Sequence, residues 1–194
     1  MGIRLNSQTG LVEGVRYIPS PNCDDRPAGI VVDTLVIHSI SLPPGHFGGG
    51  DIEALFCNRL DTEADPYYRG LVGLKVSAHL LVRRDGALTQ FVPLHKRAWH
   101  AGRSSYAGRT RVNDFSIGVE LEGVGERPYE DVQYAELSRL SALIIAAFPA
   151  VTSDRIVGHS DIAPGRKTDP GASFDWTRYR RMLHDCLAGV APSP

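Results

Sequence analysis

The segment on which the fold prediction turns lies near the C-terminus and runs Ile156-Val157-Gly158-His159-Ser160-Asp161-Ile162-Ala163-Pro164-Gly165-Arg166-Lys167-Thr168-Asp169-Pro170-Gly171. Residues 155–158 predict a short strand that ends at His159. The glycines and prolines that follow favour a shaped loop over a repeating element. The loop carries an imidazole, two carboxylates and two cations, which suits a metal or catalytic site. One loop alone cannot close such a site, so partners are expected elsewhere in the chain.

A second strand supplies the first partner. Residues 30–40 are rich in Val, Ile and Leu and predict a central strand with His38 near its carboxyl end. Ligands at the carboxyl ends of neighbouring strands converge at one edge of a sheet, so His38 and His159 are expected to meet. Catalytic zinc keeps three protein ligands and a water, and either Asp161 or Asp169 can be the third ligand. The plain alternative is that each histidine is only hydrogen-bonded within the fold.

A third strand offers a general base. Residues 116–122 alternate polar and apolar side chains, which places Glu120 and Glu122 on one face. A carboxylate on so apolar a strand is desolvated, which raises its pKa toward the range useful for proton transfer. Glu120 is the candidate base, although one of the two glutamates can instead form a salt bridge. Lys167 can stabilise an oxyanion, or it can be a solvated surface lysine.

Periodicity and turn signals predict the remaining elements. They are a short helix capped by Asp51 and reaching Asn58, an irregular section to Leu74, a hairpin over residues 76–91 around Asp85-Gly86, a helix over residues 131–148, and a helix of about ten residues from Asp175-Trp176. This order predicts an α/β (α+β) fold in which helices flank a central mixed sheet. We expect a single domain over residues 1–194.

The other histidines fit less specific roles. His79 lies in an apolar pattern and is expected in the core, while His46 and His184 are expected at the surface. His100, in the turn Trp99-His100-Ala101-Gly102, can line a cleft.

Composition excludes several classes of function. The chain has 194 residues, 42% hydrophobic and 22% charged, as in ordinary soluble proteins. A net charge of −1 argues against nucleic acid as a partner. No apolar run approaches a membrane span, and residues 1–6 lack the apolar core of a secretory signal. Cys23, Cys57 and Cys186 are odd in number and show no C-x-x-C spacing, so we expect free thiols in a reducing cytoplasm.

Short motifs in one order along residues 12–185 carry a family resemblance. They are Val36-Ile37-His38, Ile40-Ser41-Leu42-Pro43-Pro44-Gly45, Val76-Ser77-Ala78-His79, Arg83-Arg84-Asp85-Gly86, Lys96-Arg97-Ala98-Trp99-His100-Ala101-Gly102, Asn113-Asp114-Phe115-Ser116-Ile117-Gly118, Glu120-Leu121-Glu122-Gly123, Gly158-His159 and Arg166-Lys167-Thr168-Asp169-Pro170-Gly171. With them the chain resembles the zinc-dependent N-acetylmuramoyl-L-alanine amidases, which share the fold of bacteriophage T7 lysozyme and of peptidoglycan-recognition proteins. It looks most like the cytoplasmic branch that cleaves 1,6-anhydro-N-acetylmuramyl peptides during cell-wall recycling.

The resemblance implies roles that spacing leaves open. One Zn²⁺ per chain would be bound by His38, His159 and Asp169, with Asp161 outside the ligand set. Glu120 would activate the water, and Lys167 would help to stabilise the tetrahedral intermediate. The substrate would be a muropeptide, cut at the amide between the lactyl group and L-alanine.

Two positions depart from the family pattern near the expected substrate. Ser39 stands where close relatives have Asn, and Lys75 stands where they often have Arg. Ala78 stands where phage relatives have Tyr, which fits the use of Glu120. Arg111 matches a basic position that contacts the muropeptide. We expect Ser39, Lys75, Trp99, His100 and Arg111 to bind substrate.

Three functions compete. A zinc amidase needs the metal ligands together with Glu120 and Lys167, and the chain has them all. A muropeptide-binding module of the same fold typically lacks a metal ligand, and an ordinary interaction domain would not carry the ordered motifs. Within the amidases, the alternative is a secreted enzyme that acts on intact cell wall. We expect a cytoplasmic monomer that binds neither nucleic acid nor membranes.

Overall fold

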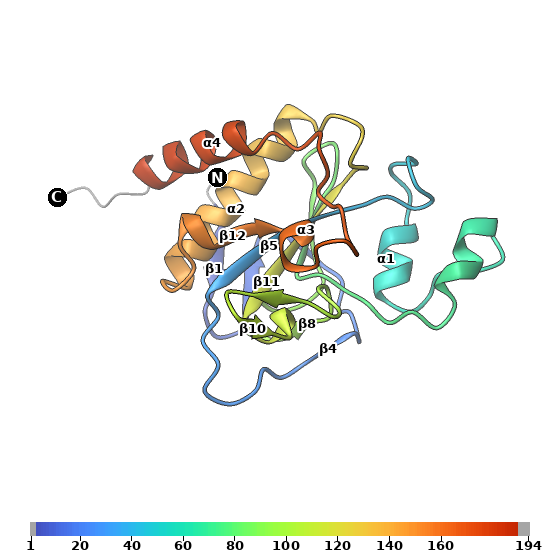
Figure 1. Cartoon of the computed structure of the whole chain (residues 1–194), viewed down its shortest axis with the longest axis horizontal. Coiled ribbons are helices and arrows are strands. Elements are labelled where there is room, and N and C mark those ends of the chain that lie inside the picture. The colour runs from blue at the N-terminus through green and yellow to red at the C-terminus, as the bar shows by residue number, and fades with distance from the viewer. Residues whose placement is uncertain (1–2, 190–194) are drawn as a thin grey trace.

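A mixed sheet organises the computed structural model, which describes residues 3–189 (Figure 1). Within these residues the sheet has six strands, in the order β12-β5-β11-β6-β7-β3. The strands from β12 to β6 run parallel, β7 is antiparallel to β6, and β3 joins β7 in parallel. The predicted α/β class with a central mixed sheet is therefore confirmed.

The elements have the following bounds. The sheet strands are β3 (Arg16–Tyr17), β5 (Thr34–Ile40), β6 (Leu80–Val82), β7 (Leu88–Gln90), β11 (Ser116–Glu122) and β12 (Ile156–Gly158). Three small ladders use β1 (Arg4–Asn6) with β2 (Leu11–Glu13), β4 (Cys23–Asp24) with β8 (Arg97–Ala98), and β9 (Ser105–Tyr106) with β10 (Arg109–Thr110). The helices are α1 (Asp51–Phe56), α2 (Asp131–Ala147), α3 (His159–Ile162) and α4 (Trp176–Gly189), with 3₁₀ turns η1 (Pro66–Leu71), η2 (Val112–Asp114) and η3 (Ser153–Arg155).

Strand β11 has one apolar face and one polar face. Ile117, Val119 and Leu121 point into the core that α2 and α4 cover. Alternation then sends Glu120 and Glu122 to the opposite face, as predicted. All seven residues of β11 are nonetheless buried, because both faces of the sheet are covered.

Helices α2 and α4 cover one face of the sheet. In Figure 1 α4 lies beside α2, and the Tyr179 hydroxyl donates a hydrogen bond of 2.7 Å to Ser141 Oγ between them. The predicted helix over residues 131–148 is confirmed. The last helix is longer than the expected ten or so residues, because Cys186 and Leu187 extend its packing stripe against the core.

The segment between β5 and β6 covers part of the opposite face. The expected short helix is present as α1, but Gly50 precedes it as the cap residue, and it ends at Phe56 instead of reaching Asn58. The Asp51 carboxylate instead accepts a hydrogen bond of 2.8 Å from the Tyr68 hydroxyl, so the expectation that Asp51 caps the helix is wrong. The section to Leu74 is not wholly irregular either, because it contains the turn η1.

The loop expectation for residues 159–171 is partly wrong. His159 follows β12 directly and begins the four-residue helix α3. Asp161 closes this turn by accepting a hydrogen bond of 2.7 Å from the Gly158 amide.

Two further findings concern the whole described part, residues 3–189. The three cysteines are free thiols, and none of the helices combines the length and hydropathy of a membrane span.

Candidate active site

A cleft of about 600 Å³ opens at the carboxyl ends of β5, β11 and β12. Nine of the ten predicted site residues line it: His38, Ser39, Lys75, Trp99, His100, Glu120, His159, Lys167 and Asp169. The tenth, Arg111, is not in the lining, because its side chain is 68% exposed and forms an ion pair with Asp114 at 3.1 Å. The fold thus brings together residues that lie more than a hundred positions apart.

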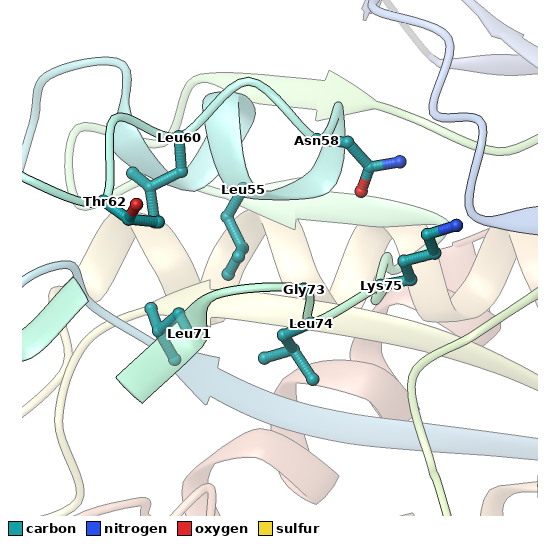
Figure 2. Close-up of a pocket in the computed structure, with 8 residues that line it drawn as sticks. All are labelled: Leu55, Asn58, Leu60, Thr62, Leu71, Gly73, Leu74 and Lys75. Carbon is teal, nitrogen blue, oxygen red and sulfur yellow. The ribbon is translucent and has the colours of Figure 1, made fainter. Parts of the chain in front are cut away.

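A smaller pocket of about 190 Å³ adjoins the cleft (Figure 2). Figure 2 shows Leu55 from α1 facing Leu71 and Leu74 across it, with Lys75 at one end. These four residues also line the cleft, so the two spaces share part of their walls. The sequence predicted a short helix and then an irregular section to Leu74, and it gave no sign that Leu55, Tyr67, Leu71 and Leu74 line the cleft.

Three lone-pair atoms meet at the floor of the cleft. His38 Nδ1 lies 2.9 Å from His159 Nδ1 and 3.2 Å from Asp169 Oδ2, and His159 Nδ1 lies 3.0 Å from the same oxygen. Zinc–ligand bonds of about 2.0–2.1 Å at tetrahedral angles would space these atoms about 3.3 Å apart. Two imidazoles and one carboxylate are also the donor types of a catalytic zinc site. The cluster therefore fits a metal ion. Among residues 3–189, these three side chains are the group whose donor atoms lie close enough together to bind one.

Local structure fixes each of the three side chains in the cluster. His38 sits near the end of β5, and His159 is the first residue after β12, whose neighbouring strand is β5. The backbone carbonyl of Asp169 accepts a hydrogen bond of 2.9 Å from the Ser160 amide, which ties the carboxylate to α3. The Tyr129 hydroxyl donates to the Pro170 carbonyl at 2.7 Å. Tyr129 was not anticipated, since nothing in its sequence neighbourhood indicates a contact with residue 170.

Burial and neighbouring groups shift the pKa values of His38 and Asp169 toward the forms that can bind a metal ion. Burial lowers the pKa of His38 to about 4, so its ring is neutral near pH 7 and has a lone pair to offer. Burial alone would raise the pKa of Asp169, but its close contacts with the His159 and His38 rings lower it overall. The carboxylate is therefore ionised, as a metal ligand must be.

Glu120 has the features of a general base. It pairs with His38 across the parallel strands, so the two side chains share one face beside the cluster. Its side chain is largely buried, and within the described residues Oε2 has no hydrogen-bond partner. Burial first, and the Asp169 charge second, raise its pKa well above the usual value, while Lys167 opposes the shift. An unpartnered oxygen with a raised pKa suits proton transfer at neutral pH.

Glu122 has a structural role instead. It accepts hydrogen bonds from the Gly48 amide at 2.7 Å, the Arg84 amide at 3.1 Å and Arg83 Nη1 at 3.2 Å. These partners tie the glycine-containing loop at residues 48–50 to the sheet. Of the two glutamates, Glu122 is therefore the one that forms the salt bridge, and the role of Glu120 as base stays a prediction.

Lys167 and four of the five predicted substrate residues line the cleft. Lys167 is exposed within the cleft, and its charge lowers the pKa of both Glu120 and His38 as a minor influence beside burial. Ser39, Lys75 and Trp99 line the walls. His100 lies deeper, and both of its ring nitrogens have partners inside the protein.

Replacement of Glu120 by Gln should stabilise the metal-free protein in a pH-dependent way. Because the folded-state pKa of Glu120 is raised above 4.5, its contribution to stability is present below that pH and is lost as pH rises through the folded-state pKa. Gln does not titrate, so the advantage of Glu120→Gln should grow from pH 5 upward, by about 1.4 kcal/mol for each unit of pKa shift. Urea unfolding in chelator from pH 5 to 9 measures it. A constant difference between the two proteins would contradict the desolvation of Glu120.

Comparison with known proteins shows the family to which the chain belongs. Residues 28–172 match the Amidase_2 family, N-acetylmuramoyl-L-alanine amidase. The chain is 52% identical over 174 residues to the 1,6-anhydro-N-acetylmuramyl-L-alanine amidase AmpD of Citrobacter freundii, covering 90% of this chain and 92% of that protein. A crystal structure of a selenomethionine AmpD derivative superposes with a TM-score of 0.89 at 51% identity, covering 92% of this chain and 98% of that one.

A more distant structure contains a substrate. It is the E. coli N-acetylmuramyl-L-alanine amidase AmiD with anhydro-N-acetylmuramic acid-L-Ala-D-γ-Glu-L-Lys, at 29% identity and a TM-score of 0.57, covering 93% of this chain and 65% of that one. With the family match over most of the sequence, the conclusion follows that this chain belongs to the N-acetylmuramoyl-L-alanine amidase family.

Proposed function

We propose that this protein is a zinc-dependent amidase that cleaves the bond between the lactyl group of 1,6-anhydro-N-acetylmuramic acid and L-alanine, in peptidoglycan recycling. The observation that carries the proposal is the His38–His159–Asp169 cluster beside the unpartnered carboxylate of Glu120. The identity of about half with AmpD proteins, which carry that activity in their name, supports the substrate class.

The roles follow from general chemistry. A zinc ion held by His38, His159 and Asp169 would supply Lewis acidity and lower the pKa of a water to about 7. Glu120 accepts the proton of the attacking water and passes it to the departing L-alanine nitrogen. Its buried position favours both steps, because desolvation makes the carboxylate a stronger base. The Lys167 ammonium stabilises the negative charge that develops on the carbonyl oxygen.

The cleft walls supply the substrate contacts in this proposal. Ser39, Lys75 and Trp99 line the same space as the metal cluster, and Lys75 offers a cation to a peptide carboxylate. Arg111 lies outside the lining, where its exposed side chain pairs with Asp114, so its contact with substrate stays a prediction. We expect one zinc ion per chain, a single domain over residues 1–194, and a monomer that acts in the cytoplasm without nucleic acid or membrane partners.

Two other functions stay open to test. A muropeptide-binding module would need no base, yet Glu120 is buried beside the cluster and its Oε2 has no hydrogen-bond partner within residues 3–189. A secreted amidase would act on intact cell wall with the same site. A secreted amidase and a recycling amidase would share this site geometry, so only the substrate that is cleaved distinguishes them.

Metal analysis tests the proposed ligands. The purified protein should contain about one zinc per chain. Asp169→Ala should lose most of this zinc, because it removes a ligand at 3.0–3.2 Å from both histidine nitrogens. The matched variant Asp161→Ala should keep it, because the Asp161 carboxylate accepts from the Gly158 amide and is not part of the cluster. Mass spectrometry of metal content after desalting distinguishes the two, and equal zinc loss in both variants would reject this ligand set.

A digest tests the reaction. Anhydro-muropeptide and intact sacculus are incubated separately with the protein, and the products are analysed by mass spectrometry. We expect free peptide with an L-alanine amino terminus from the first substrate and little from the second. Glu120→Ala should keep zinc and lose about 10²–10⁴-fold in rate, the usual contribution of general acid–base catalysis. Release from sacculus alone would indicate a wall hydrolase, binding without release a recognition module, and full activity of Glu120→Ala a different base.

A further inference from the structure

Both metal-ligand histidines rest on the same turn, Trp99-His100-Ala101-Gly102. His159 Nε2 donates to the Ala101 carbonyl at 3.3 Å, and His38 Nε2 lies 2.9 Å from His100 Nδ1. In each ring, Nε2 therefore faces residues 99–102 and Nδ1 faces Asp169. A ring proton on Nε2 is what leaves the Nδ1 lone pair free for a metal.

The hydrogen bonds of His100 allow one consistent assignment of donors and acceptors. If His38 carries its proton on Nε2, that N–H donates to His100 Nδ1. The proton of His100 is then on Nε2, which donates to Ser116 Oγ at 3.2 Å. The Ser116 hydroxyl in turn donates to the Val112 carbonyl at 2.7 Å. Every donor has an acceptor, and the chain ends at a backbone oxygen that cannot reverse its role.

The surrounding residues hold the turn rigidly. Asn113 Oδ1 accepts from the amides of His100 at 3.1 Å and Ala101 at 2.7 Å. Arg166 Nη2 donates to the Ala101 carbonyl at 2.8 Å. The His100 ring lies directly on the backbone of β11, because a Cβ at Gly118 would be only 2.5 Å from His100 Cγ. Glycine at position 118 is thus required for His100 to reach His38.

We propose that His100 is a positioning residue for the metal centre: its Nδ1 accepts the Nε2–H of His38 and so fixes the ring in the tautomer that presents Nδ1 to the metal. This rests on the proposed zinc site. It replaces the expectation that His100 contacts substrate, since both of its ring nitrogens are engaged within the protein. The Ala101 carbonyl performs the equivalent task for His159.

Two substitutions at His100 separate the effect of losing the hydrogen-bond acceptor from the effect of losing the ring. His100→Phe keeps a ring over Gly118 and loses the acceptor. His100→Asn loses the ring but keeps an oxygen at the position of Nδ1, two bonds beyond Cβ. Zinc affinity is measured by competition with a chromophoric chelator. We expect His100→Phe to bind zinc about 10–100-fold more weakly than wild type, and His100→Asn to recover most of that loss.

A tautomer measurement excludes a merely structural effect. In metal-free protein, ¹⁵N chemical shifts should show His38 protonated at Nε2 in wild type and His100→Asn, and a mixture of tautomers in His100→Phe. Thermal unfolding in chelator checks that each variant folds. If His100→Phe does not fold, Ser116→Ala serves, because it leaves His100 in place and removes the acceptor of its Nε2–H. That variant should weaken zinc binding severalfold.

The outcomes separate the two proposals. Wild-type protein that does not bind zinc would overturn the proposed metal site itself. Wild-type protein that binds zinc no more tightly than a folded His100→Phe, with the His38 tautomer unchanged, would overturn the role of His100. Equal losses in the Phe and Asn variants would also overturn it, because the acceptor would then be irrelevant.

Discussion

His38, His159 and Asp169 hold three electron-rich atoms within 3.2 Å of one another, and such atoms repel unless a cation or a proton lies among them. Such a cluster persists only where the surrounding fold keeps it together. Two neighbouring parallel strands deliver the histidines, and the Ser160 amide and the Tyr129 hydroxyl hold the segment around Asp169. A metal ion would turn this repulsion into binding energy.

The two faces of β11 explain how one sheet serves both stability and chemistry. Its apolar side chains fill the core beneath α2 and α4. Its polar face then places, at alternate positions, Ser116 behind His100, Gly118 under the His100 ring, Glu120 at the cluster and Glu122 on the loop at residues 48–50. The desolvation that makes Glu120 a strong base arises because this second face is covered as well.

Much of this arrangement could be predicted from sequence, because it depends on local patterns. Apolar runs predicted the strands that end near His38 and His159, and the three-to-four spacing predicted α2. The choice between Asp161 and Asp169 could not be made from spacing, since both follow His159 in one loop. Only the fold shows that Asp161 bonds the Gly158 amide, although the family resemblance already indicated Asp169. The roles of Glu122, His100 and Tyr129 depend on partners far away in sequence, so no local signal revealed them.

The coordination of bound zinc tests the central claim most directly. X-ray absorption at the zinc edge reports the number, type and distance of the ligand atoms. We expect a four-coordinate shell of nitrogen and oxygen at about 2.0–2.1 Å, with the scattering pattern of two imidazoles. A sulfur ligand at about 2.3 Å, or a shell without two imidazoles, would contradict it.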